Sequence, residues 1–514
     1  MVAASMSKAA SVCATCKARK KRCDKSLPCC GYCAHRNLVC RYQNTSPNLP
    51  PHTPDANLSR SSPAQSSRSV RRGYGFDSVS TAKYVSPPIL FPSLASSLYL
   101  PTDGQTPTSA SRLCTETQRL LGSMGLYLDE ISVRYFQGIH AFVPIISRRR
   151  FHGRLLSFGA DPQPDFALLL LCMGLLTNSA DPLGQLSPQR PHPSADEVTL
   201  YVATKSLMAQ AHALLPLTTH LIQAGVLLAV YEYALGYPER AFVTIGTYAR
   251  MAYAAGMQSA PSVNTTSTTR TDWLEEQEEN NTRWGIRICE RTFLCELAVL
   301  NQPLASVMPA GDIRLPLESR ILNQGSPTVA LASSVAVHAL DAPGIGGFGR
   351  AAQAAWLLED VLRGLCFADP DRQRAHLIQC DRTMQSFLTT LMQQNEGGSW
   401  GEFCVAIALT IRALFLLHSH LLGRCAGTSS SDSQPAISHL ALDTTTKMVV
   451  DIAATREHLA DSQIDRLPPS CMYIIRAALK HLHDVNDRAT TADAQLRTTL
   501  RKLEGRWGGD CPAV

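Results

Sequence analysis

Six cysteines near the N-terminus follow the spacing C-x2-C-x6-C-x6-C-x2-C-x6-C, which is the pattern C-x2-C-x6-C written twice. They are Cys13, Cys16, Cys23, Cys30, Cys33 and Cys40. In each half, the Cys-x-x-Cys pair can grip one metal ion and the third cysteine can return to it. Zinc prefers four tetrahedral ligands, so two separate ions would need eight thiolates where six are available. Two cysteines must therefore bridge two zinc ions, and the repeat symmetry predicts that Cys13 and Cys30 are this pair.

A seventh cysteine, Cys29, leaves an alternative open in the second half. It could replace Cys30 in a C-x3-C clamp with Cys33. We favour Cys30, because it preserves the repeat and because zinc clamps are usually C-x2-C or slightly longer. A thiol redox pair is a further interpretation of Cys-x-x-Cys, but two matching halves of three cysteines each argue against it.

The segment between Cys16 and Cys23 is strongly basic. Five of its six residues are cations: Lys17, Arg19, Lys20, Lys21 and Arg22. Residues 1–43 hold nine lysines and arginines against one acid, a local charge of +8 in a chain whose net charge is +6. Such density on a short predicted helix favours salt-dependent binding to DNA phosphates and fits the major groove. A nuclear-import signal would use the same residues and does not compete with this interpretation.

The remaining cysteines are spread singly along the chain. Seven of the 17 lie between Cys13 and Cys40, and the other ten are scattered from Cys114 to Cys511. Residues 1–10 offer no apolar stretch of the kind that a secretory signal needs. We therefore expect reducing conditions inside the cell, where clustered cysteines indicate metal or redox chemistry rather than structural disulfides.

The composition changes abruptly after Tyr42. Residues 44–110 contain 14 serines and 10 prolines and lack a sustained apolar period. This composition predicts a disordered linker. The sequence thus divides into a metal-binding, DNA-binding module at residues 1–43, a linker at 44–110 and a large domain at 111–514.

From residue 111 onward, apolar residues recur at three- and four-residue steps, and strand-like alternation is scarce. This pattern predicts an all-α domain of ten or more helices, so the chain is mostly α as a whole. The expected helical stretches include 166–176, 197–214, 220–235, 241–257, 283–301, 350–366, 374–394, 403–422, 438–458 and 469–484. The stretch 403–422 is long enough to cross a membrane, but Arg412 lies in its middle. We interpret it as a core helix and predict no membrane partner.

Residues 13–40, with Cys23-Asp24 and Pro28, resemble the fungal zinc binuclear-cluster DNA-binding domain. Parts of the large domain are similar to the helical middle region of the same family, although the family's usual paired tryptophans appear only as Trp284-Gly285. The stretch Phe348–Leu365 looks like the C-terminal helices of regulators of fungal secondary metabolism. The similar segments of the middle region include Tyr135-Phe136, Phe142–Ile146, Arg150-Phe151, Gly246–Ala252 with Gly256, Glu290-Arg291 and Asp312–Pro316.

This resemblance implies a nuclear transcription factor that holds two zinc ions and acts on RNA polymerase II promoters, in a secondary-metabolite gene cluster. It implies that the first-half helix reads CGG-type triplets of double-stranded DNA, with Lys20 at the guanines and Arg19 beside it. Lys17, Lys21 and Arg22 would chiefly hold phosphates. The implied partners include the transcription machinery and, as one option, a second copy of the chain.

Two strings that match enzyme motifs are predicted to be coincidental. Gly344, Gly346 and Gly349 spell G-x-G-x-x-G, but helical flanks surround them where a dinucleotide site needs a strand. Residues 397–401 spell G-x-S-x-G, but a helix precedes them where a nucleophile elbow needs a strand. No catalysis is therefore predicted. The rival classes are an enzyme built on the helical domain and a thiol or metal-buffering protein, and the five adjacent cations argue against the latter.

Overall fold

The computed structural model separates the chain into two compact units, residues 1–101 and 102–514. The predicted linker lies outside the described residues except for residues 108–110. The described residues are 11–19, 21–26, 30–36, 40, 108–178, 195–257, 270–308, 313–324, 335–397, 401–425, 434–455, 461–485 and 491–508.

Helices form nearly all the regular structure of the described residues. The first unit contains α1 (Ala14–Ala18) and α2 (Gly31–His35). The second unit contains α3 (Ser109–Ser123), α4 (Leu128–Gln137), η2 (Ile139–Ala141), α5 (Arg148–Ser157), α6 (Pro164–Asn178), α7 (Ala195–Leu214), α8 (Thr219–Ala234), α9 (Pro238–Ala254), α10 (Arg270–Leu294), α11 (Ser319–Gln324), α13 (Gly347–Leu365), α14 (Pro370–Gly397), α15 (Cys404–Cys425), α16 (Gln434–Ala454), α17 (Asp461–Ile464), α18 (Ser470–Val485) and α19 (Thr491–Trp507).

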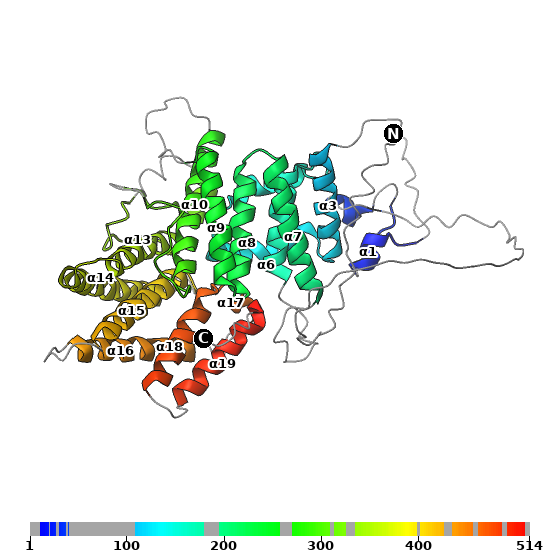
Figure 1. Ribbon diagram of the computed structural model, residues 1–514. Helices are drawn as coiled ribbons and strands as arrows, with labels where there is room; N and C mark the ends of the chain where they lie inside the picture. The colour runs from blue at the N-terminus through cyan, green and yellow to red at the C-terminus, as the bar shows by residue number, and fades with distance from the viewer. Residues whose placement is uncertain are drawn as a thin grey trace, which may run out of the picture. The chain divides into compact units, whose positions relative to one another are not determined.

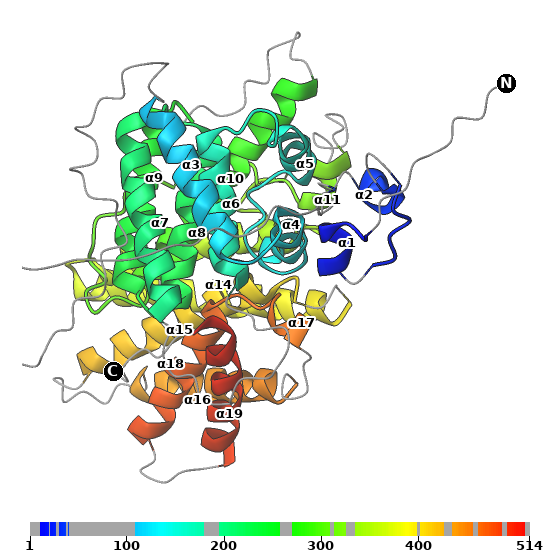
Figure 2. The same cartoon turned by 90° about the vertical axis from the view of Figure 1, so that its right-hand side faces the viewer.

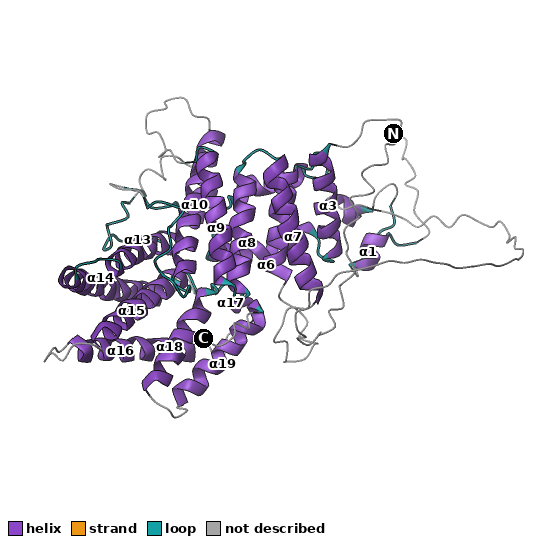
Figure 3. Ribbon diagram, in the orientation of Figure 1, coloured by secondary structure: helices purple, strands orange, loops and turns teal. Residues whose placement is uncertain are grey.

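Figure 3 shows helices and loops but no strand in the part of the chain that is described. An isolated antiparallel bridge pairs Arg314 with Ala336. The predicted mostly-α class is confirmed.

The first half of the large unit is built around α6 and α8, which contact each other. Nearly every described side chain of both helices is buried, so they are apolar on all sides rather than on one face. In Figure 1, α8, α9 and α10 stand side by side, and α3 packs against α6 on the opposite side from α9. These surrounding helices remove the two central helices from water.

The second half of the large unit is organised around α15, which contacts α13, α14, α16 and α18. Figures 1 and 2 both place α16, α18 and α19 together at the lower end of the unit. Residues 404–423 are long and apolar enough to cross a membrane by length and composition, yet 67% of this stretch is buried inside the protein. Arg412 on α15 donates to both carboxylate oxygens of Glu296, at 2.9 and 3.1 Å, and to the Cys295 carbonyl oxygen. The central arginine is thus paired within the protein, as a core helix requires.

A buried ion pair joins the two halves where α10 meets α13. Arg291 on α10 is fully buried and donates two hydrogen bonds to the Glu359 carboxylate on α13, at 2.9 and 2.7 Å. The same guanidinium donates to the Ser306 carbonyl oxygen at 2.7 Å. The neighbouring Glu290 carboxylate accepts from the backbone N–H groups of Ala305 and Ser306, at 2.6 and 2.9 Å. These contacts hold the chain after α10 against the helix that begins the second half.

The predicted helical stretches agree with the observed helices except in and around α10. The stretch 283–301 was expected to be helical, but α10 begins at Arg270 and ends at Leu294. The prediction was wrong at the far end because Glu290 and Arg291 bind the backbone of residues 305–306, which turns the chain back. The sequence interpretation named no helical stretch at α3, α5, α11, α17 or α19.

A glycine allows the close approach of α8 and α9. A Cβ atom at Gly225 would lie 2.2 Å from the Tyr248 ring, which is itself buried.

We expect Gly225→Ala to lower the free energy of unfolding by about 1–3 kcal/mol, because the added methyl group would overlap this buried ring. Thermal denaturation followed by far-UV circular dichroism measures this. The matched control is Gly122→Ala on the exposed face of α3, where no atom lies within 4 Å of the new Cβ. It should stabilise the protein by about 0.5–1 kcal/mol, and an equal loss from both substitutions would contradict the packing argument.

Candidate metal centre

The two halves of the cysteine repeat form the same local structure. Cys13 is the N-cap of α1 and its Sγ accepts from the backbone N–H of Cys16 at 3.3 Å. Cys30 is the N-cap of α2 and its Sγ accepts from the backbone N–H of Cys33 at 3.4 Å. A helix N-terminus favours negative charge, so each cap position suits a thiolate. The repeat in the sequence is therefore also a repeat in structure.

The structure brings all six predicted ligands together in two overlapping groups. The Sγ atoms within each group all lie within 4.8 Å of one another. The first group is Cys13, Cys16, Cys23 and Cys30, and the second is Cys13, Cys30, Cys33 and Cys40. The two groups have Cys13 and Cys30 in common, which are the cysteines predicted to bridge. Cys29 lies outside the described residues, so the alternative clamp stays untested.

The distances between sulfur atoms fit zinc. Four thiolates at about 2.3 Å from one zinc ion lie about 3.8 Å from each other. The Sγ of Cys13 lies 3.8 Å from that of Cys30, and the Sγ of Cys16 lies 3.6 Å from that of Cys30. In the second group the Sγ atoms of Cys13 and Cys33 are 3.7 Å apart. These spacings suit thiolates that share a tetrahedral ion, and the Sγ atoms of Cys16 and Cys33, one from each group, also lie 3.9 Å apart.

Asp24 connects the two halves of the module. Both of its carboxylate oxygens lie 3.0 Å from the backbone nitrogen of Gly31, and its side chain also accepts from Ser26. These hydrogen bonds, first the one from Gly31, lower the pKa of Asp24 below its ordinary value. Lys25 has a positive φ of 61°, which turns the chain between Asp24 and Ser26. The sequence interpretation used Asp24 only as part of a resemblance and missed this structural role.

The basic segment is less helical than predicted. The helix α1 ends at Ala18 with Arg19 as its C-cap, so Lys17 lies on the helix while Lys21 and Arg22 follow it. The backbone N–H of Lys21 donates to the Cys16 carbonyl oxygen at 3.0 Å. The chain must leave the helix here to return Cys23 to the cluster. The side chains of Lys17, Lys21 and Arg22 are exposed and Arg19 is half-buried, whereas Lys20 lies outside the described residues.

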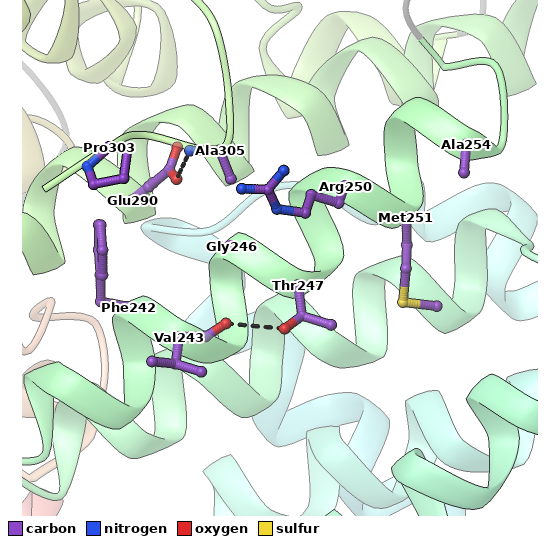
Figure 4. A pocket seen from close by; sticks show the side chains of 10 residues that line it. All are labelled: Phe242, Val243, Gly246, Thr247, Arg250, Met251, Ala254, Glu290, Pro303 and Ala305. Atoms are coloured by element: carbon purple, nitrogen blue, oxygen red, sulfur yellow. Dashed lines mark hydrogen bonds between the residues drawn. The ribbon is translucent and has the colours of Figure 1, made fainter.

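The large unit has an open pocket of about 540 Å³ between α9 and the segment after α10 (Figure 4). Of the residues that line it, Arg250 and Glu290 are charged and most others are apolar. The Glu290 carboxylate is engaged by the backbone of residues 305–306. Figure 4 shows Arg250 reaching across from α9 toward Ala305. The residues that line the pocket are mostly apolar, Arg250 is the one cation among them, and they include no nucleophile paired with a base.

Two glycines of the G-x-G-x-x-G string, Gly346 and Gly349, serve helix packing. Gly346 is the N-cap of α13, and the backbone N–H of Gly349 donates to the Glu318 carboxylate at 2.9 Å. A Cβ atom at Gly346 would lie 2.5 Å from the Glu318 side chain, and one at Gly347 would lie 2.0 Å from the Glu402 carbonyl oxygen. A carboxylate thus already occupies the position that a phosphate would need. The segment is a loop before a helix, as predicted.

The G-x-S-x-G string lies between two helices. The helix α14 ends at Gly397 and α15 begins at Cys404. Ser399 itself lies outside the described residues. A nucleophile elbow requires a strand before the serine, and a helix stands there instead.

Comparisons with known proteins give three matches. Residues 11–49 match the family described as the fungal Zn(2)-Cys(6) binuclear cluster domain. Residues 133–316 match the fungal specific transcription factor domain. The chain is 32% identical over 152 residues to Transcription factor BOA15 of Botryotinia fuckeliana (strain B05.10), which covers 29% of this chain and 79% of that protein. No solved structure matches the chain.

Proposed function

Because this chain belongs to the fungal Zn(2)-Cys(6) transcription factors, we propose that it acts in the nucleus on RNA polymerase II promoters of a secondary-metabolite gene cluster. The membership makes the protein a zinc-binding, DNA-binding transcription regulator and not an enzyme. The resemblance of Phe348–Leu365 to regulators of secondary metabolism supports the choice of pathway.

The proposed metal centre holds two zinc ions. Cys13 and Cys30 bridge them, Cys16 and Cys23 complete one site, and the remaining ligands are Cys33 and Cys40. The observation that carries this proposal is the overlap of the two sulfur groups at Cys13 and Cys30. Two zinc ions and six thiolates leave a net negative charge, which the neighbouring cations offset.

The proposed DNA contacts come from the basic segment of the first half. Lys17, Lys21 and Arg22 are exposed next to the cluster, which suits phosphate contacts. Lys20, with Arg19 beside it, is proposed to read the guanines of CGG-type triplets in the major groove. The metal cluster sets the spacing of these side chains because Cys16 and Cys23 stand at either end of the segment.

The proposed division of labour assigns residues 1–43 to DNA, 44–110 to a linker and 111–514 to regulation through the transcription machinery. A homodimer is part of the proposal. The buried face of α3, with Leu113, Leu120 and Leu121, packs against α6 and α7 of the same chain. A dimer would therefore need another surface than this face of α3.

Lys20→Ala is expected to separate base reading from general DNA affinity. If Lys20 donates to guanine edges, its loss should cost about 1–3 kcal/mol on CGG-containing DNA and much less on random duplex, because only the specific complex uses this contact. Fluorescence-anisotropy titrations of the full chain on both DNAs at several salt concentrations measure this. Equal losses on the two DNAs would refute the base-reading role.

Arg22→Ala is the matched control within the same segment. A phosphate contact is used on every sequence, so this substitution should weaken both DNAs similarly and lower the salt slope by about one unit. A selective loss on CGG-containing DNA would reverse the two assignments. No preference of the wild-type chain for CGG over random duplex would contradict the proposed target sequence.

A further inference from the structure

Three potential metal ligands converge outside the N-terminal cluster, between α13 and α14. Asp360 lies on α13, and His376 and Cys380 lie on α14. The four-residue spacing of His376 and Cys380 places both side chains on the same face of α14. The helices α13 and α14 contact each other. One carboxylate, one imidazole and one thiol thus point into the same space from two packed helices.

The distances between the three ligand atoms suit a single small ion. The Cys380 Sγ lies 3.5 Å from the Asp360 Oδ2 and 3.5 Å from the His376 Nε2. The His376 Nε2 lies 3.6 Å from the Asp360 Oδ1 and 3.2 Å from the Asp360 carbonyl oxygen, a hydrogen bond that metal binding would replace. Ligands about 2.0 to 2.3 Å from a tetrahedral zinc ion are separated by about 3.3 to 3.8 Å. The thiol and the imidazole are thus at tetrahedral spacing from each other, and each lies at that spacing from one of the two Asp360 carboxylate oxygens.

Packing around His376 fixes this arrangement. A Cβ atom at Gly364 would lie 2.5 Å from the His376 ring, so the glycine makes room for the imidazole. The Phe367 ring covers it at a centroid distance of 5.0 Å. Gln373 donates to the carbonyl oxygens of Gly364 and Leu365, at 3.2 and 2.8 Å, which ties the start of α14 to the end of α13. The imidazole is thus held in place before any ligand arrives.

The same three residue types could form a nucleophilic triad, but the geometry opposes it. A triad needs one imidazole nitrogen at the nucleophile and the other at the acid. Here the His376 Nε2 faces both Cys380 and Asp360. Burial raises the pKa of the Cys380 thiol to about 12, so the thiol is no ready nucleophile. Because one imidazole nitrogen faces both the thiol and the carboxylate, the three residues are arranged as metal ligands and not as a catalytic triad.

We propose that Asp360, His376 and Cys380 form a third metal site, which takes zinc or a similar divalent transition ion and leaves the fourth position to water. Mixed sulfur, nitrogen and oxygen ligands suit Zn²⁺ and disfavour Mg²⁺ and Ca²⁺. Binding releases the thiol proton of Cys380 to solvent. The Arg363 Nη1 lies 3.2 Å from the Asp360 Oδ1, so this exposed side chain would have to leave that oxygen when the ion binds.

The test counts zinc in the full chain by inductively coupled plasma mass spectrometry after loading and desalting. Wild-type protein should hold one zinc ion per chain more than Cys380→Ser and one more than His376→Asn. The N-terminal cluster is present in all variants, so the difference does not depend on how many ions it holds. Cobalt-loaded protein provides a second readout, because Cys380→Ser should lose the near-ultraviolet charge-transfer absorption of one thiolate.

The matched control is Cys366→Ser. It removes an exposed thiol at the C-terminal end of α13, the helix that carries Asp360, and Cys366 is not one of the three ligands. It should keep the wild-type zinc count. Equal counts in wild type, Cys380→Ser and His376→Asn would overturn the proposal, as would an equal loss from Cys366→Ser. If Cys380→Ser fails to fold, His376→Asn decides, since this side chain is 26% exposed. Specific DNA binding should be unchanged in the site variants, so the proposal can fail without the DNA-binding function failing.

Discussion

Replacing Cys30 by serine is expected to remove two zinc ions per chain and to abolish specific DNA binding. Cys30 belongs to both sulfur groups and caps α2, so its loss deprives both ions of a ligand at once. Zinc binding supplies roughly 10–16 kcal/mol to modules of this kind, and a module of this size has little other core. Mass spectrometry of bound zinc and anisotropy titrations on CGG-containing DNA measure the two effects.

Cys29→Ser is the control for this prediction. If Cys30 is the ligand, the neighbouring thiol is dispensable, and Cys29→Ser should keep its zinc and its DNA affinity. The opposite pattern would show that the C-x3-C clamp with Cys33 is the correct one. Loss of only one ion from Cys30→Ser would contradict the bridging role and make Cys30 a ligand of a single zinc.

Arg291→Met is expected to cause the largest loss of stability in the helical unit, about 3–5 kcal/mol. The substitution keeps most of the apolar volume of the side chain but removes the arginine that pairs with Glu290, whose side chain is 1% exposed, and with Glu359, and it removes the hydrogen bond to the Ser306 carbonyl oxygen. Breaking one side of a buried pair leaves an uncompensated charge away from water. The shift of the urea midpoint, followed by far-UV circular dichroism, measures the loss.

Arg363→Met removes the other arginine that faces the same carboxylate. The Arg363 Nη2 lies 3.7 Å from the Glu359 Oε1, and the Arg363 side chain is 60% exposed. A solvent-exposed pair contributes up to about 1 kcal/mol, so this variant should unfold close to the wild-type midpoint. Similar losses from both variants would mean that burial does not decide the strength of these pairs.

The apolar period of the sequence located the helices that bury apolar side chains. It failed for a helix whose buried side chains are polar. The helices α6 and α8 are apolar on all sides, so their positions follow from composition alone. The first half of α10 buries Glu278 and Asn281, which bind the backbone at Ser147 and Leu317. These partners lie more than 30 residues away in sequence, so no local pattern could reveal that the helix starts at Arg270.

The metal centre was more predictable than the segment beside it. Spacing, symmetry and the ligand count of zinc predict two groups of sulfurs that share Cys13 and Cys30, and the Sγ atoms form two such groups, while the bridging of two ions stays a prediction. The end of α1 at Ala18 could not be read from five adjacent cations, because it depends on the return of Cys23 to the cluster. The N–H group of Gly31 that binds Asp24 likewise depends on where the second helix begins.

The two capping cysteines give the protein a reciprocal dependence on its metal supply. Cys13 both starts α1 and belongs to each sulfur group, so the backbone that carries the basic segment begins at a proposed metal ligand. If DNA binds only the zinc-loaded form, the apparent affinity for DNA rises with free zinc until the centre is saturated. By thermodynamic reciprocity, bound DNA raises the affinity for zinc by the same factor. A molecule bound to DNA would therefore lose less zinc to a chelator at equilibrium than one in free solution.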